Sequence, residues 1–308
     1  METMTMKKQI TKKKSDTRKA TLVKRDKTSP AIKAAGLSAM VKAGVTFRGV
    51  TFKKDTGVKA PAQGYAAGCD YAVTIERGKP VAQLMSSASI PPNAFGGFHC
   101  APGGNAAGIS GGNNAPAINP HSIWDRHFRP ACDDPRGMTL VDVPGKGRVW
   151  CDIYLLGKDH LKNGTSRHGV TIADGTDRPQ NPAGGSFSRF DYDAACAVMK
   201  HHGKQLLGAE EFFAAAYGVT EKTAVGADPK TTGLDAPRTS RFGLMQATGN
   251  RWVWGTDGHP DIPRASLFGG SWVDDSGAGS RCANLDYWPD NSYGSLGARG
   301  RSDHLQLG

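Results

Sequence analysis

The sequence lacks any long apolar run. No window of about 18 consecutive apolar residues occurs, which is the length that a membrane-spanning helix needs. The basic N-terminus also lacks the apolar stretch of roughly 7–15 residues that follows the basic start of a secretory signal, its longest being Ala20-Thr21-Leu22-Val23. We therefore expect neither insertion into a membrane nor a signal peptide.

Closely spaced cysteines are missing as well. No two of the six cysteines lie within four residues of each other, which excludes the pair spacing of zinc fingers and of dithiol redox motifs. They are Cys69, Cys100, Cys132, Cys151, Cys196 and Cys282. Because no export signal is present, we expect buried free thiols.

The common catalytic and phosphate-binding motifs are absent. There is no phosphate-binding loop, no Gly-x-Ser-x-Gly elbow and no His-Glu-x-x-His, and Gly111-Gly112-Asn113 does not follow a strand that feeds a helix. The polar candidates are scattered: His201-His202 at a helix end, and Asp133-Asp134 and Asp274-Asp275 in turns. Solvent-exposed histidines and ordinary turns are the expected roles, with metal binding or acid–base chemistry as alternatives. We expect no catalytic residue, no metal and no cofactor.

Charge is unevenly distributed along the chain. The formal net charge is +11, and residues 1–34 hold eleven Lys and Arg against three Asp and Glu, a balance of +8, which leaves +3 for the other 274 residues. We interpret residues 1–34 as a basic flexible tail, a leader or assembly peptide, with a nucleic-acid-binding arm as the alternative. The near-neutral remainder gives no reason to expect a nucleic-acid partner elsewhere.

Glycine is abundant, 40 of 308 residues, which argues against a helical bundle. Residues 35–95 alternate apolar and polar side chains, and this pattern predicts strands and a small β-rich domain. Residues 96–119 are rich in Gly, Ala, Asn and Pro, which predicts a loop or linker. All six tryptophans follow that segment, so we place the principal core in a second domain over residues 96–308.

Two helices are predicted in this second domain. The first runs roughly over Asp191–His202, with Ser188 as its N-cap and Gly203 at its end. The second runs over about Ala209–Tyr217 with Gly218 as its C-cap. Everything after it is glycine-punctuated and strand-like or irregular, so the predicted class is α+β.

Three motifs near the C-terminus carry a family resemblance. They are Gly249-Asn250-Arg251-Trp252-Val253-Trp254, Leu267-Phe268-Gly269-Gly270-Ser271-Trp272 and Gly297-Ala298-Arg299-Gly300. Together they resemble the formylglycine-generating-enzyme version of the C-type lectin fold. The enzymes of that family carry two closely spaced cysteines after the Gly-Gly-Ser strand, whereas this region has only Cys282. The resemblance therefore implies a C-type-lectin-like domain without that enzyme chemistry.

A closer resemblance covers most of the chain after residue 95. Residues 265–307, with Trp272, Gly279-Ser280-Arg281 and Asp303-His304-Leu305, are similar to the variable region of diversity-generating-retroelement target proteins, above all phage tropism determinants. In that family a reverse transcriptase copies a template repeat with errors at adenines, and the copy replaces the 3′ end of the gene. The resemblance implies a hypervariable receptor-binding protein with its variable region at 265–308. It also implies a tail-fibre tip on a phage virion or surface display by a bacterium or prophage, a homotrimer, and a protein or glycan receptor.

The resemblance also assigns individual residues. The implied variable, ligand-binding positions are Ser271, Val273, Asp274, Asp275, Gly277, Asn284, Asp286, Tyr287, Asn291, Tyr293, Ser295 and Leu296. The implied scaffold residues are Trp252, Trp254, Gly269, Gly270, Trp272, Arg281 and Arg299, and Trp288 also lies at a position between variable ones. All twelve variable positions avoid Lys, Glu, Gln, Met and Trp, which adenine randomisation of Asn codons cannot produce. Residues 271–296 contain four Asp, one Arg and no Lys, the wrong sign for binding phosphate.

Three alternatives stay open for this region. The residues could be ordinary turn formers in a glycine-rich loop. Asp274-Asp275 and Asp290-Asn291 could ligate Ca²⁺ in a carbohydrate-binding lectin. An enzyme of the formylglycine-generating type would need a second thiol near Cys282.

Overall fold

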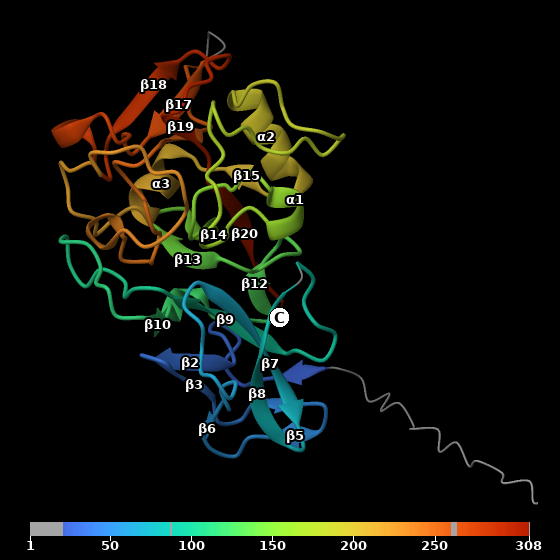
Figure 1. Ribbon diagram of the computed structural model, residues 1–308. Coiled ribbons are helices and arrows are strands. Elements are labelled where there is room, and N and C mark those ends of the chain that lie inside the picture. Colours follow the sequence, from blue (N-terminus) through green and yellow to red (C-terminus); the bar gives the residue numbers. More distant parts are fainter. Residues whose placement is uncertain (1–20, 87, 260–263, 308) are drawn as a thin grey trace, which may run out of the picture.

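One antiparallel sheet of ten strands runs through most of the molecule. The computed structural model describes residues 21–86, 88–259 and 264–307. In spatial order the strands are β13 (Met138–Val143), β14 (Gly147–Asp152), β20 (Gly300–Gln306), β12 (Phe128–Pro130), β11 (Trp124–Asp125), β9 (Gly96–Ala101), β7 (Cys69–Glu76) and β8 (Lys79–Leu84), with β10 (Ala117–Ile118) on β9 and β15 (Gln205–Leu206) on β20. The last strand, β20, returns to the middle of this sheet (Figure 1).

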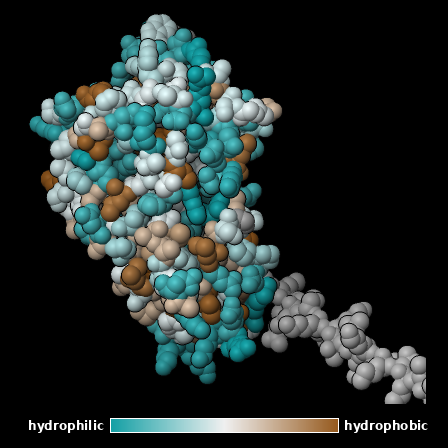
Figure 2. All heavy atoms as spheres, viewed as in Figure 1, coloured by the Kyte–Doolittle hydropathy of each residue, from teal (hydrophilic) through white to brown (hydrophobic). Residues whose placement is uncertain are grey.

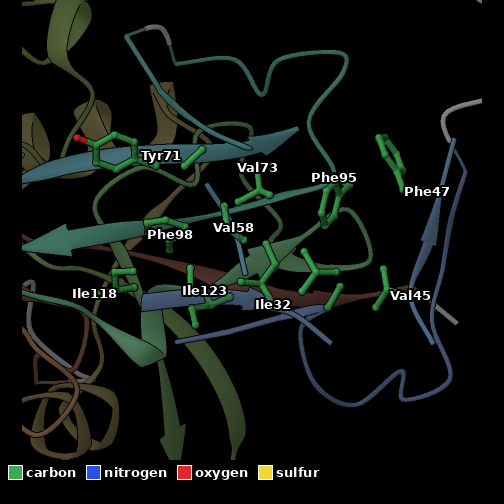
Figure 3. Packing of buried hydrophobic residues seen from close by; sticks show 14 of the residues in the cluster. Ile32, Val45, Phe47, Val58, Tyr71, Val73, Phe95, Phe98, Ile118 and Ile123 are labelled. Atoms are coloured by element: carbon green, nitrogen blue, oxygen red, sulfur yellow. The ribbon is translucent and has the colours of Figure 1, made fainter. Parts of the chain in front are cut away.

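Two small sheets complete the N-terminal part. The first is β1 (Leu22–Val23), β4 (Thr46–Phe47) and β5 (Val50–Thr51), and the second is β2 (Ile32–Ala35), β3 (Ser38–Val41) and β6 (Thr56–Gly57). Side chains from both small sheets, such as Phe47 and Ile32, meet Val73 of β7 and Phe98 of β9 in one hydrophobic cluster (Figure 3). Because alternate strand residues face opposite sides, Ala72 of β7 packs into a different cluster together with Trp124 and Trp150. Strand β7 is therefore covered on both faces.

The C-terminal part contains the helices and a second sheet. The helices are α1 (His160–Asn163), α2 (Tyr192–His201) and α3 (Ala209–Ala215), with short 3₁₀ turns η1 (Pro120–Ser122), η2 (Ala236–Arg238) and η3 (Asp275–Gly277). Strands β18 (Ala283–Tyr287), β17 (Ala265–Phe268), β16 (Trp252–Gly255) and β19 (Leu296–Gly297) form a sheet in that order. This sheet lies at the end of the molecule away from β2, β3, β5 and β6 (Figure 1). Among the described residues, no helix combines the length and apolarity needed to cross a membrane.

The predicted basic tail is too long at its C-terminal end. Residues 21–34 are folded: Leu22 is buried and pairs with Phe47, and Ile32 is fully buried. The Lys24 ammonium forms a buried ion pair with Asp125 at 2.7 Å. The high density of basic residues predicted that Lys24 lies in solvent, but Asp125 neutralises its charge in the core. The predicted tail therefore extends too far along the chain. The remaining tail residues, 1–20, lie outside the described part of the chain.

The predicted linker over residues 96–119 also differs from the structure. Its first six residues form β9, in which every residue is buried, and the large sheet therefore continues across the boundary that we placed between residues 95 and 96. The glycines that suggested a loop instead permit close packing. A Cβ on Gly97 would lie 2.5 Å from the Trp124 ring, so only glycine allows that indole to lie against the strand.

Both predicted helices are present, and capping explains where each begins. Helix α3 ends at Ala215 with Ala216 as its C-cap, two residues before the predicted Gly218. Helix α2 begins after Asp191, whose carboxylate accepts a hydrogen bond from the Ala194 N–H at 2.9 Å, so Asp191 rather than Ser188 is the N-cap. At the start of α3, the Gly208 N–H donates to the Glu211 carboxylate at 2.9 Å. The short helix α1 was not predicted, because its four residues carry no readable periodicity.

Candidate functional site

The sheet β16–β19 supports the region that the sequence singles out. Its turn after β17 is made by Gly269 and Gly270, with φ of +92° and +76°. A Cβ on Gly269 would lie 2.9 Å from the Phe212 ring, and one on Gly270 would lie 2.7 Å from Ala278. Glycine is therefore required twice, for the left-handed backbone and for the close packing. The turn directs the chain out of the sheet into the 3₁₀ turn η3.

Six of the twelve expected variable positions are exposed. They are Val273, Asp275, Gly277, Asn284, Asp286 and Tyr293. Four more, Asp274, Tyr287, Asn291 and Ser295, are half-buried. We define the exposed and half-buried positions between residues 273 and 295 as the variable surface. Strand β18 contributes three of them and is an edge strand of its sheet.

Two expected ligand-binding positions are not on the surface. Ser271 is 0% exposed, and both its N–H and its hydroxyl donate to the Asp274 carboxylate. Leu296 is 1% exposed and packs in the cluster that contains Trp254. The expectation that these two side chains contact a ligand is wrong for this chain, because both are held in the scaffold beneath the surface.

A tryptophan that we expected in the scaffold is exposed instead. Trp288 directly follows β18 and is 54% exposed. The Arg264 guanidinium lies over its ring at 3.2 Å from the centroid, and the same guanidinium pairs with Asp286 at 2.5 Å. The indole is therefore held in place on the variable surface, next to Asp286 and Tyr287.

The segment after β18 has no regular secondary structure, and hydrogen bonds from residues distant in the sequence fix its course. The Gly175 N–H donates to the Tyr293 carbonyl at 3.0 Å, and the Tyr192 N–H donates to the Pro289 carbonyl at 3.0 Å. The Ser292 hydroxyl accepts from the Phe190 N–H at 2.9 Å. Most of these contacts use backbone atoms, so side chains at Asn291 and Tyr293 can change without removing them.

The other scaffold residues divide into buried and exposed ones. Trp254 and Arg299 are fully buried, whereas Trp252 and Trp272 are half-buried. Arg281 is exposed and lines a surface hollow beside α3 together with Glu210 and Tyr217. The sequence pattern assigns all of them to the scaffold, because a motif does not show which of its residues are buried.

Charge separates the two ends of the molecule. Residues 1–86 hold 18 Lys and Arg against 6 Asp and Glu, whereas residues 87–308 hold 21 against 22, a balance of +12 against −1. Eight of the cations in residues 21–86 are exposed, among them Lys53, Lys54 and Lys79. Hydrophilic side chains predominate at the lowest edge of the molecule in the view of Figure 2, with hydrophobic ones interspersed above it. The basic character therefore belongs to the whole N-terminal part and not to a tail alone.

The alternative chemistries find little support in this geometry. In the described part of the chain, no three His, Cys, Asp or Glu side chains come together as a metal site. The Asp274 carboxylate is engaged by Ser271, and Asp134 is paired with Arg136 at 2.8 Å. All six cysteines are free, three of them buried and three, including Cys282, half-buried.

The paired histidines behave differently from one another. His201 is exposed, as expected, but His202 is half-buried, with its Nε2 lying 2.8 Å from Nδ1 of the buried His160. The Nε2–H of His160 donates to the Gln180 carbonyl at 2.7 Å, so its Nδ1 accepts from His202. Burial, followed by the neighbouring His160, lowers the pKa of His202 to about 3, and burial also lowers the pKa of His160.

These lowered pKa values predict an acid-sensitive fold. The unfolded chain binds more protons than the folded one between the ordinary histidine pKa of 6.5 and about 3, so stability falls as the pH drops through that window. We expect the free energy of unfolding to fall by about 1–2 kcal/mol between pH 7 and pH 4.5, measured by urea denaturation. In His202→Gln, whose amide can still donate to His160, the decline should be clearly smaller. An equal decline in both proteins would contradict this assignment.

Comparison with known proteins places the chain in a family. The family model described as "Mtd second domain" matches residues 29–125. A "Tail fiber receptor-binding protein" of Bordetella phage BPP-1 is 40% identical over 333 residues, covering 94% of this chain and 86% of that protein. Among solved structures, the Major Tropism Determinant U1 and I1 variants match with a TM-score of 0.86 at 38% and 39% identity, each covering 95% of this chain and 88% of the other. These matches confirm the predicted α+β, C-type-lectin-like fold. The chain belongs to the major tropism determinant (Mtd) family.

Proposed function

We propose that this protein is a phage tail-fibre protein that recognises a receptor on the host cell through the variable surface. The observation that carries this is the contrast between a main chain held by the scaffold and the exposed side chains above it. Gly269, Gly270 and the backbone hydrogen bonds at residues 289–293 hold the main chain. The side chains above it are of the kinds used in antibody paratopes, in which Tyr gives rigid contact area and Asn, Ser and Asp give adaptable hydrogen bonds. The relative from Bordetella phage BPP-1 bears the name of a tail fibre receptor-binding protein.

The chemistry of the variable surface favours a receptor with hydrogen-bond donors or cationic groups. Asp275, Asp286 and Asp290 are exposed, and Asp274 is half-buried. Tyr293 and Trp288 supply aromatic surface beside them, each 54% exposed. Aromatic anchors surrounded by polar groups are typical of binding hot spots. A protein or a glycan of the outer cell surface can supply the complementary groups, and the family gives no reason to expect catalysis.

Diversification by a retroelement is part of this proposal. It accounts for side chains that differ in type but share exposure, such as Val273, Asp275 and Tyr293. The neighbouring DNA provides the test. A near-copy of the 3′ end that differs at adenines, next to a reverse-transcriptase gene, is the expected finding, and a gene neighbourhood with neither would remove the basis for diversification.

A homotrimer is the assembly that the family resemblance implies. Several copies on one fibre tip would raise avidity even where each site binds modestly. Native mass spectrometry of the purified full chain should give three times the mass of one chain of 32.6 kDa. A monomer at micromolar concentration would contradict this part of the proposal without affecting the binding surface.

The variable surface should control binding without controlling folding. We expect the double variant Val273→Ala and Tyr293→Ala to bind cells of the susceptible host at least about tenfold more weakly, because both side chains are more than half exposed and available for contact. Its free energy of unfolding should stay within about 0.5 kcal/mol of the parent. Binding of the fluorescently labelled full chain to intact cells, with and without a metal chelator, is the measurement.

The matched control is Tyr217→Ala, which removes an exposed tyrosine that lies after α3, outside the variable region. It should leave both binding and stability unchanged. Tyr287→Ala differs from both, because that ring lies 5.8 Å from the buried Trp254 ring and its loss should cost stability as well as binding. Full binding by the double variant would reject the proposed surface, and loss of binding in chelator alone would favour a Ca²⁺-dependent lectin.

A further inference from the structure

Two of the six cysteines lie opposite each other in the large sheet. Cys69 on β7 and Cys100 on β9 are partners in the antiparallel register. Side chains of such partners lie on the same face of a sheet. The next pair on that face, Tyr71 and Phe98, has its ring centroids 5.9 Å apart, and both cysteines pack in the same hydrophobic cluster as those rings.

The spacing of this pair suits a disulfide. Antiparallel partners have Cα atoms about 4.5–5.5 Å apart, within the roughly 4.4–6.8 Å range of disulfides. Cys69 also lies at the start of its strand, where the ladder is irregular. Its N–H donates to the Ala66 carbonyl, while the Gly68 N–H, at φ +78°, donates to the Cys100 carbonyl at 2.7 Å. The Gly68–Cys100 hydrogen bond therefore holds the two strands together beside the cysteine pair. No other cysteine has a cysteine as its register partner in the described strands.

The two thiols differ in access. Cys69 is half-buried, and Cys100 is fully buried. Burial, followed by the neighbouring Cys69, raises the pKa of Cys100 to about 11. A reagent from solution must therefore meet Cys69 first, and Cys100 lies behind it as the second thiol.

We propose that Cys69 and Cys100 form a modification site, a cross-strand disulfide made when the protein meets a small-molecule disulfide such as oxidised glutathione. The Cys69 thiolate attacks a sulfur of oxidised glutathione, forming a mixed disulfide and releasing one reduced glutathione. The Cys100 thiol then gives its proton to the released glutathione thiolate, and its sulfur attacks the Cys69 sulfur and displaces the second glutathione. The two protein thiols are oxidised, one glutathione disulfide is reduced to two thiols, and no other oxidant is needed. A virion outside its host meets such oxidising conditions.

The disulfide would lie next to residues that connect the large sheet to the C-terminal part. The adjacent register pair is Asp70 and His99, whose side chains point to the other face. Asp70 accepts from the Gly137 N–H at 2.9 Å, and His99 Nε2 lies 3.0 Å from the Tyr154 hydroxyl. These contacts join β7 and β9 to the C-terminal part. A disulfide one residue away would close a loop of about 30 residues and raise the Tm by several degrees.

The test uses the full chain treated with oxidised glutathione. Free thiols should fall from six to four, and trypsin digestion without reduction should give residues 60–77 linked to residues 78–126, detected by mass spectrometry. Cys100→Ser should leave no linked peptide, whereas Cys196→Ser, a half-buried thiol elsewhere, should leave the link intact. The parent and both variants are first compared by circular dichroism and Tm.

The outcomes are distinct. A linked peptide together with a raised Tm supports the site. A lasting glutathione adduct on Cys69, six unreacted thiols, or a link to a different cysteine would overturn it. None of these measurements involves a receptor. Failure to form the disulfide would therefore leave the proposed receptor recognition unaffected.

Discussion

Replacing Arg299 with methionine should lower the free energy of unfolding by about 3–5 kcal/mol. The guanidinium is 0% exposed and donates to four backbone carbonyls: those of Asp152 at 2.8 Å, Ile153 at 2.5 Å, Met245 at 2.8 Å and Gln246 at 3.3 Å. Methionine fills much of the volume but removes the guanidinium donors of these oxygens in a site closed to water. Of the four, the Ile153 carbonyl keeps a donor, the Met245 N–H at 2.9 Å. Arg299 therefore joins the end of β14 to the segment before β16.

Urea denaturation followed by circular dichroism measures the effect. Arg281→Met is the matched control, because that arginine is exposed and its loss should change stability by less than about 0.5 kcal/mol. If Arg299→Met were as stable as the control, the carbonyls would have to find other donors, and the joining role given to Arg299 would be wrong.

Replacing Lys204 with methionine should cost a similar amount, about 3–5 kcal/mol. Its ammonium donates to Asp152 at 2.6 Å and to the Thr165 hydroxyl at 2.7 Å, and the lysine and aspartate side chains are 2% and 0% exposed. The variant removes the ammonium that pairs with the Asp152 carboxylate in the core. Among the described residues, the Gly300 N–H, at 3.0 Å, would still donate to its other oxygen.

The double variant Lys204→Met with Asp152→Leu separates the two causes of this loss. Removing both charges should recover part of the stability, because the unpaired carboxylate is then gone. If the double variant were no more stable than Lys204→Met, packing, and not the unpaired charge, would dominate the loss.

The ion pair of Lys204 with Asp152 also predicts how stability depends on pH. Burial opposes the charged form of Lys204, but the Asp152 carboxylate more than offsets this and holds the pKa of Lys204 above its ordinary value. A raised pKa contributes stability that is present below the ordinary lysine pKa and is lost as the pH rises above it. Stability should therefore show no titration of Lys204 between pH 7 and pH 9.

The regular elements were largely predictable because their signals are local. Helices α2 and α3 have short-range apolar spacing and acidic residues in their first turns, and both are present. The cap of α2 was misplaced by three residues, since both Ser188 and Asp191 are good caps and only the path of the chain selects one. Strand β9 was missed because its glycines resemble a loop until Trp124 is known to pack on them.

The candidate surface was predictable as a region but not residue by residue. Motif spacing placed Val273, Asp286 and Tyr293 among the variable positions, and these are exposed. The same spacing included Ser271 and Leu296, which are buried, and it set Trp288 among scaffold positions although the indole is exposed. Exposure depends on what packs over a residue from elsewhere in the chain, and spacing contains no such information.

The sequence by itself determined the family, the α+β class and the glycines that direct the chain after β17, because these depend on motifs and on backbone conformations that few residues can adopt. Only the tertiary structure decided where the charges act and which residues meet. Lys24 lies in the core because Asp125 is there to pair with it. Cys69 faces Cys100 because β7 and β9 are neighbours in one sheet. Both facts depend on contacts between distant residues, which form only when loss of chain entropy is offset by burial of the whole core.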